Sequence, residues 1–355
     1  MNKFFFISFI IVFLFKTQTV FSNNLIYDVN NIEVSGKINN NLDKKKLIKS
    51  AIQKAFISFI NKYLLKVDAV SLYTTKINTI EDLVFAYQIV ENKKKNEKVN
   101  ILTVNIKFDQ KKISNFLAQK KISYADIENI SLTLLPILIK DKSIYTLSEN
   151  YFYNNWTNTE KKIVNINDIL ISYNLALENI EDIEYINSNK DNLELIDPEK
   201  LTSFNNVENY ALLLIYFSEN KFKAFVKTSI ENQKIDRSFD LKIYPENETK
   251  TYEEAISTLK EEINQIWKSQ NLIDASTPSF LDLFLEVREI KDYLKLRSIF
   301  NSLDVIENYS VLEMTNKHIK VRLKYKGKVN KLRDKLLKNK INIKIIDNVW
   351  KATIN

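Results

Sequence analysis

The sequence predicts an α+β protein built from several small mixed or antiparallel sheet domains in series. Segments whose apolar residues alternate, as in strands, are interspersed with segments whose apolar residues recur every three or four positions, as in helices. A polar, Asn-rich stretch over 148–206 and the Ala-Ser-Thr-Pro segment at 275–278 divide these elements into three groups. We therefore expect an N-terminal targeting segment at 1–22, domains at 23–147, 148–274 and 279–355, and a linker at 275–278.

The composition excludes several classes of site. The 355 residues include 52 Lys and Arg against 44 Asp and Glu, for a net charge of +8, with no Cys, one His and two Gly. Without Cys there is no disulfide framework, thiolate metal site or catalytic thiol. Gly36 and Gly327 lie too far apart in the sequence to share a glycine-rich nucleotide loop. The sequence thus predicts no cofactor and nominates neither metal ligands nor catalytic residues.

The N-terminus has the three-part pattern of a secretory signal peptide. Lys3 gives a positive start, residues 4–15 are apolar except for Ser8, and small or branched residues at 20–22 suit cleavage after Ser22. The apolar run is much shorter than the roughly 20 residues that a membrane span needs. We expect a periplasmic or otherwise exported protein, cleaved near Ser22, with no transmembrane helix in the mature chain. A retained membrane anchor is the alternative.

The first domain combines helices with a β-hairpin. Apolar spacing predicts a helix over 43–65, and Thr79 begins a second, short helix. Strands are predicted at 25–34, 85–91, 99–108 and 130–139, with a charged, solvated loop at 92–98. Asp109 caps a further helix through Leu117, and Pro136 predicts that the last strand lies at a sheet edge, because proline cannot donate to the ladder.

Three features of this domain form a recognisable set. A strand ends in Val34-Ser35-Gly36, an Ala- and Phe-rich helix follows, and two later runs read EDLVFAYQI at 81–89 and VNIKFD at 104–109. Over about 25–145 the chain resembles an exported proteobacterial family called domain of unknown function 2066. The resemblance implies export and brings no catalytic residues. This chain departs from the family in lacking most of its usual glycines and arginines.

The middle domain is predicted as a meander with a helix on one face. A helix is expected over 163–177, and three strands at 210–217, 222–230 and 235–244 are joined by short polar turns. Thr251 to Glu254 read as a capping box that opens a helix running to Gln270.

The last domain has the element order βαββαβ. Strands are predicted at 280–287, 305–314, 318–326 and from Ile341, with helices at 290–302 and 328–339. This is the order of the ferredoxin-like split βαβ fold. Asp347 and Asn348 predict the turn of a small terminal hairpin that ends in Trp350.

The basic charge is concentrated in this last domain. Residues 279–355 hold 17 Lys and Arg against nine Asp and Glu (17 − 9 = +8), whereas residues 23–278 hold 33 against 35 (33 − 35 = −2). Ile319, Val321 and Leu323 alternate with cations along one strand, so these cations share its opposite side. The candidate anion- or partner-binding residues on this strand and the next helix are Lys320, Arg322, Lys324, Lys326, Lys328, Lys331, Arg333 and Lys335.

This basic domain predicts a non-catalytic binding or assembly role in the cell envelope. Its partner would be an acidic envelope protein or an anionic envelope surface, namely phospholipid headgroups, lipopolysaccharide or the carboxylates of peptidoglycan. The alternative for the charges is a solvated face partly paired to Asp282 and Glu286 on the adjacent strand. The sequence argues against nucleic acid, because the basic side of 318–326 carries no aromatic residue for base stacking and because the protein is expected to be exported.

A cofactor-free, carboxylate-based envelope hydrolase is the second class that the sequence leaves open, since any fold can bring two acids together. His318 is the only histidine of the chain, and its neighbours in the sequence are lysines. We therefore expect it to have a structural role and not to bind a metal or transfer a proton. Four acids of one segment lack the spacing of a calcium loop and predict a solvated helix face. They are Glu178, Glu181, Asp182 and Glu184.

Overall fold

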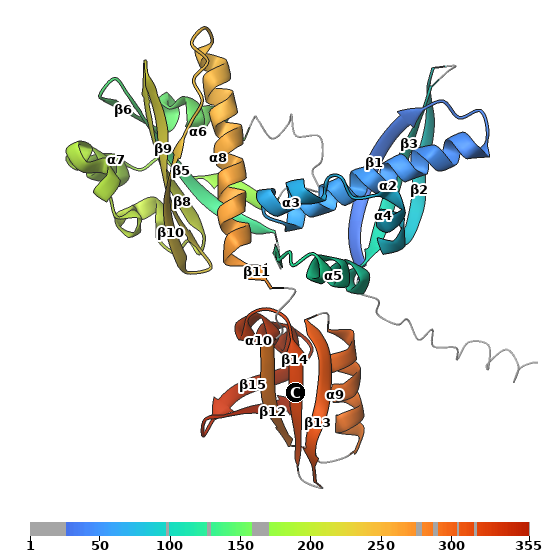
Figure 1. The fold of residues 1–355 in the computed structure, drawn as a ribbon. Helices are drawn as coiled ribbons and strands as arrows, with labels where there is room; N and C mark the ends of the chain where they lie inside the picture. Colours follow the sequence, from blue (N-terminus) through green and yellow to red (C-terminus); the bar gives the residue numbers. More distant parts are fainter. Residues whose placement is uncertain are drawn as a thin grey trace, which may run out of the picture.

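The computed structural model describes residues 26–96, 99–125, 129–157, 170–274, 279–286, 290–303, 305–315 and 318–354. These residues form three groups of elements, each with its own main sheet and hydrophobic core (Figure 1). The predicted α+β fold in series is confirmed. The signal segment expected at 1–22 and the linker expected at 275–278 lie outside the described residues. In the part of the chain that is described, no helix is long and apolar enough to cross a membrane.

The first unit packs α2 against a three-stranded antiparallel sheet ordered β1-β3-β2. Its elements are β1 (Ile26–Gly36), α2 (Asn41–Tyr63), α3 (Lys66–Leu72), α4 (Ile77–Leu83), β2 (Val84–Asn96), β3 (Val99–Asp109) and α5 (Gln110–Gln119). Asn40 and Asp109 cap α2 and α5, each accepting a backbone hydrogen bond at 2.9 Å. The loop expected over 92–98 is shorter, because β2 pairs with β3 as far as Asn96 opposite Val99 and the ladder satisfies this backbone.

The middle unit is built on a six-stranded sheet in which β10-β9-β8-β5-β6 follow one another and β7 also pairs with β5. Its strands are β5 (Ile130–Lys140), β6 (Ser143–Thr146), β7 (Ile171–Leu175), β8 (Tyr210–Ser218), β9 (Lys221–Ile230) and β10 (Gln233–Asp240). One face is covered by α6 (Tyr151–Asn155) and α8 (Glu248–Gln270). The other is covered by α7 (Ile180–Ser188) and by short 3-10 turns, including Thr202–Phe204. The predicted meander is confirmed by β8, β9 and β10.

The position of β5 corrects two predictions. The sequence places this strand at an edge of the first domain, but it lies inside the middle sheet, parallel to β8. Pro136 is tolerated because it falls between the pairing of β5 with β7, which ends at Leu134, and with β6, which starts at Ile137. The Asn150 side-chain amide donates to the Pro136 carbonyl at 2.8 Å across this gap. The chain therefore changes sheets between β3 and β5, before the boundary expected at 147/148.

The helix expected over 163–177 is wrong where the structure describes it, because β7 pairs with β5 there. Ile171 and Tyr173 are buried whereas Ser172 and Asn174 are exposed, which is the two-residue period of a strand. The start of that expected helix, before residue 170, lies outside the described residues.

The start of α8 also differs from the prediction. Asn247 caps the helix, accepting from the Lys250 N–H at 2.8 Å, so α8 begins before the predicted capping box. Thr251 lies inside the first turn, fully buried, and its hydroxyl accepts from the Tyr244 N–H at 2.9 Å. Thr251 is therefore a buried residue of the first turn and not the cap that the sequence predicts.

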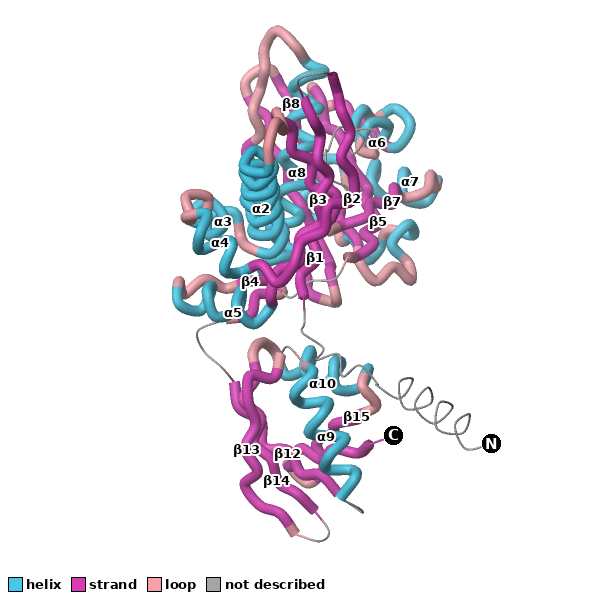
Figure 2. The backbone as a smooth tube through the Cα atoms, turned by 90° about the vertical axis from the view of Figure 1, so that its right-hand side faces the viewer, coloured by secondary structure: helices cyan, strands magenta, loops and turns pink. Residues whose placement is uncertain are grey.

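The C-terminal unit is a five-stranded sheet ordered β13-β14-β12-β16-β15. Its elements are β12 (Ser279–Glu286), α9 (Ile290–Ser302), β13 (Ile306–Met314), β14 (His318–Tyr325), α10 (Val329–Lys338), β15 (Ile341–Ile346) and β16 (Val349–Ile354). The predicted turn of the terminal hairpin is confirmed, and Asp347 and Asn348 take its positive φ angles, 54° and 60°. The hairpin is longer than predicted, because its second strand continues past Trp350 to Ile354. β16 lies parallel to β12, so β15 takes the sheet edge. Both helices pack on one face of the sheet (Figure 2).

The three units meet around a two-stranded ribbon of β4 (Tyr124–Ala125) and β11 (Leu272–Ile273). Ile273 is buried in the core of the first unit. Tyr63 of α2 packs against the cores of both the first and the middle unit. The Lys268 ammonium of α8 donates to the Asn61 carbonyl of α2 at 2.5 Å. The basic C-terminal unit thus follows directly on the segment that joins the other two.

Candidate functional site

The strand β14 alternates as the sequence predicts. Ile319, Val321 and Leu323 are buried beneath the helices, and Lys320 and Arg322 lie on the opposite face of the sheet. From the sequence, a basic binding surface is expected on this face. Whether its cations are available to a ligand depends on the acids that already contact them.

Arg322 is engaged by a carboxylate on the neighbouring strand. It lies directly opposite Asp282 of β12, and its Nε and Nη2 donate to the two Asp282 oxygens at 2.6 and 2.8 Å. Lys320 Nζ lies 3.9 Å from the same carboxylate. The hydrogen bond from Arg322 lowers the pKa of Asp282 below its usual range. Two cations therefore share one ionised acid.

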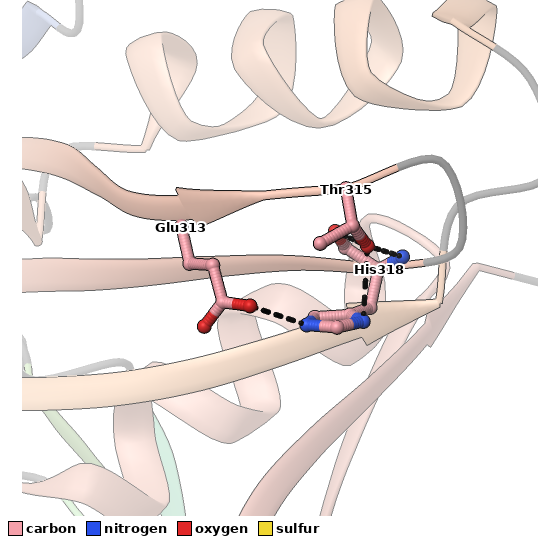
Figure 3. A network of polar contacts seen from close by, with 3 residues as sticks. All are labelled: Glu313, Thr315 and His318. Atoms are coloured by element: carbon pink, nitrogen blue, oxygen red, sulfur yellow. Dashed lines mark hydrogen bonds and ion pairs between the residues drawn. The ribbon is translucent and has the colours of Figure 1, made fainter.

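The remaining polar residues of β14 pair with β13. Lys324 Nζ lies 3.2 Å from Glu307. At the hairpin end, His318 Nε2 lies 3.1 Å from the Glu313 carboxylate and His318 Nδ1 lies 3.1 Å from the Thr315 hydroxyl (Figure 3). Both nitrogens of the one histidine thus tie the hairpin together. This contact is consistent with the structural role predicted for it.

An aromatic ring also reaches this face from the adjacent strand β12, whose aromatic residues the sequence analysis did not weigh. Phe284 of β12 lies opposite Lys320, whose ammonium is 5.2 Å from the ring centroid. The His318 ring is 6.1 Å from the same ring. The sheet face is therefore a network of paired charges around a phenylalanine and not an uncompensated basic patch.

Two of the candidate residues lie in the contact between units. Lys326 is only 8% exposed, its ammonium is 2.5 Å from the Ser114 hydroxyl of α5, and burial lowers its pKa. Lys328 donates to the Gln270 carbonyl at the end of α8 at 2.8 Å. These two lysines join the C-terminal unit to the others instead of facing a ligand.

The last three candidates, Lys331, Arg333 and Lys335, lie on the other side of the unit. They belong to α10, whose Leu332 and Leu336 pack on the buried face of the sheet. The eight candidates are thus not brought together. They fall on the sheet face, in the contact between units and on the helical side.

The helical side carries more positive charge than the sequence analysis assigned to it. The two helices hold seven cations, namely Lys291, Lys295 and Arg297 of α9 and Lys331, Arg333, Lys335 and Lys338 of α10. They hold only two acids, Asp292 and Asp334, for a net charge of 7 − 2 = +5. We call the solvent-facing side of α9 and α10 the basic helix face. The cations of α9 could have been found from the βαββαβ order, because it places both helices on one face of the sheet.

The acids of α7 do not gather around an ion site. Asp182 is buried, which corrects the solvated face expected for this segment, and it accepts from the Thr202 and Ser203 N–H groups at 2.6 and 3.0 Å and from the Ser203 hydroxyl. It therefore caps the short turn Thr202–Phe204. Among the described residues, no group of three or more His, Asp or Glu side chains could hold a metal ion.

One hollow of the middle unit contains two carboxylates. Its volume is about 340 Å³, and Asp197, Asp236, Lys227 and Tyr210 are among the residues that line it. Asp197 is already engaged, because it accepts from the Glu199 N–H at 3.1 Å. Asp236 is exposed and lies opposite Lys227 on β9. A second hollow of this unit, of about 380 Å³, is lined by two other acids, Glu208 and Glu231.

No family model, curated protein or solved structure gives a significant match to this chain. The resemblance of the first domain to domain of unknown function 2066 therefore stays a prediction.

Proposed function

We propose that the protein is a non-catalytic binding or assembly protein of the cell envelope, and that its C-terminal unit attaches to an anionic partner or surface through the basic helix face. The observation that carries this proposal is that acidic residues balance the cations on the sheet face of the unit but not on its helices. β14 and its neighbours β12 and β13 hold three Lys and Arg against four acids, whereas α9 and α10 together hold seven cations and two acids, one of which, Asp334, lies 3.7 Å from Arg333. A local excess of positive charge attracts anions, and salt weakens this attraction.

The envelope location rests on the N-terminal pattern. A positive start, the apolar run at 4–15 and a cleavage-type sequence ending at Ser22 are the parts of a secretory signal. Export also agrees with the resemblance of the first domain to an exported family.

The test is sedimentation of the mature chain with isolated bacterial envelopes at low and high salt. The variant K295Q/R297Q/R333Q removes three exposed cations of the basic helix face. We expect it to lose most of the salt-sensitive binding, because a cation near an anionic surface contributes on the order of 1 kcal/mol.

The matched control is K45Q/K46Q/K111Q, which removes three exposed cations from α2 and α5 of the first unit and changes the net charge equally. It should bind as the wild type does. An equal loss in both variants would mean that net charge alone acts. Full binding by K295Q/R297Q/R333Q would show that the basic helix face is not the site.

A second candidate, a cofactor-free envelope hydrolase, is favoured by hollows that two acids line, and the one with Asp197 and Asp236 is the first to test. Release of soluble fragments from purified peptidoglycan by the wild type, but not by D236N, would support it. Without such release, the binding role stands alone.

A further inference from the structure

Two leucines protrude from the basic helix face. Leu294 of α9 is 55% exposed and Leu337 of α10 is 50% exposed. Leu294 lies two positions before the buried Leu296, and two positions correspond to about 200° around a helix, so it points away from the core. Neither leucine is needed to fill the core of this unit.

Each leucine has at least one cation within about one helical turn of it. Lys291 precedes Leu294 by three positions and Arg297 follows it by three, which places all three on neighbouring parts of the α9 surface. On α10 the neighbours differ, because Arg333 lies four positions before Leu337 and Asp334, 3.7 Å from the Arg333 guanidinium, lies three positions before it. Lys338 follows Leu337 directly and lies about 100° further around the helix. Leu294 therefore has two cations beside it on the helix surface, whereas Leu337 has one cation and one acid.

Exposed apolar side chains on a helical surface of net positive charge fit the boundary of an anionic bilayer. The cations meet the headgroups, and the apolar side chain enters the edge of the acyl region. A soluble acidic partner without apolar surface would use the cations and leave the leucines in water. The combination of charge and protruding leucine therefore discriminates between the two.

We propose that the basic helix face rests on an anionic phospholipid bilayer, with Leu294 and Leu337 inserted between the headgroups. This inference rests on the proposed function and names its partner. The ion-paired sheet face then points away from the bilayer, because it lies on the opposite side of the unit.

The first test measures binding of the mature chain to phosphatidylcholine vesicles with and without phosphatidylglycerol. The wild type should bind only the anionic vesicles. The variant L294S/L337S keeps every charge and should bind them about tenfold more weakly, because each leucine loses several buried carbons. The control L177S/L195S replaces two leucines of the middle unit that are 82% and 79% exposed, and it should bind as the wild type does.

The second test measures insertion directly. The chain has no cysteine, so L294C and L177C each offer a single thiol for an environment-sensitive fluorophore. The label at 294 should shift to shorter wavelength on anionic vesicles, and the label at 177 should not. An unshifted label at 294 on vesicles that do bind the protein would overturn the insertion.

Soluble polyglutamate separates this inference from the proposed function. If the wild type binds polyglutamate but not anionic vesicles, the lipid inference fails and binding to an anionic partner stands. If L294S/L337S binds anionic vesicles as tightly as the wild type, the lipid inference fails as well. If the wild type binds neither probe, both proposals fail.

Discussion

Arg322 binds both carboxylate oxygens of Asp282, the residue directly opposite it across β14 and β12. This two-point contact compensates the positive charge of Arg322, which the sequence analysis assigned to ligand binding. It also gives the C-terminal unit a defined dependence on pH, because the pKa of Asp282 is lowered chiefly by the hydrogen bond from Arg322.

We expect R322Q to lose this pH dependence. The pKa of Asp282 is lower in the folded than in the unfolded chain, so the pair stabilises the folded state above the ordinary carboxyl pKa. That stabilisation is lost as the pH falls through the lowered pKa. The difference in urea midpoint between wild type and R322Q should thus be largest at neutral pH and should disappear in acid.

The double variant D282N/R322Q provides the control for the pair. It should show no further pH dependence from this contact, because the titrating carboxyl is gone. A difference between wild type and R322Q that is constant down to strong acid would contradict the assignment of the effect to Asp282.

Local patterns predicted much of the fold, and the errors concern partners distant in the sequence. The elements of the C-terminal unit follow from periods of two and of three to four residues, which each segment carries in itself. The place of β5 depends on its pairing with β8, about 75 residues later. On sequence alone, Pro136 indicates an edge strand. It needs only a point at which the strand pairing is interrupted, and the gap on β5 between its pairing with β7 and its pairing with β6 provides that point.

In the candidate site, too, local patterns predicted the orientation of side chains, whereas partners distant in the sequence were missed. Alternation along β14 predicted which side chains face away from the core, and Asp282 was foreseen as a partner. Glu307 and Glu313 were not, because the register of β13 on β14 contains two bulges. The burial of Lys326 depends on a contact with α5, 212 positions earlier, and no local pattern reports that.

The contribution of Lys326 to stability should depend on pH for a different reason from that of the Asp282–Arg322 pair, because here the charged form is the unfavourable one in the folded state. Burial lowers the pKa of its ammonium below the unfolded value, so the folded state bears the cost of a buried cation at neutral pH. As the pH rises through the lowered pKa, this cost disappears. The stability of the wild type relative to K326M should therefore rise between neutral pH and about 10, measured as urea midpoints. A difference that does not change with pH would contradict this account.

Asp182 should be among the acids whose loss destabilises the middle unit most. Its carboxylate accepts from two backbone N–H groups and one hydroxyl of the turn Thr202–Phe204, and D182A leaves these donors without a partner. We expect a loss of about 2–4 kcal/mol in the free energy of unfolding, and a smaller loss for D182N, which keeps one acceptor. E184Q, at an exposed position of the same helix, is the control and should change little. Added calcium should not alter these values.

The two glycines of the chain form a natural pair of test and control. Gly327 has φ of +90°, and a Cβ there would lie 3.1 Å from Cγ1 of Ile273 in β11. G327A should therefore cost about 1–3 kcal/mol in urea unfolding, because alanine is strained at that φ and presses on the segment that joins the units.

At Gly36 the φ is ordinary and a Cβ would meet only the flexible end of the Leu47 side chain. G36A should cost less than about 1 kcal/mol, since Leu47 can move and alanine restricts the unfolded chain. Equal effects of the two substitutions would show that Gly327 is not constrained by its contact with β11.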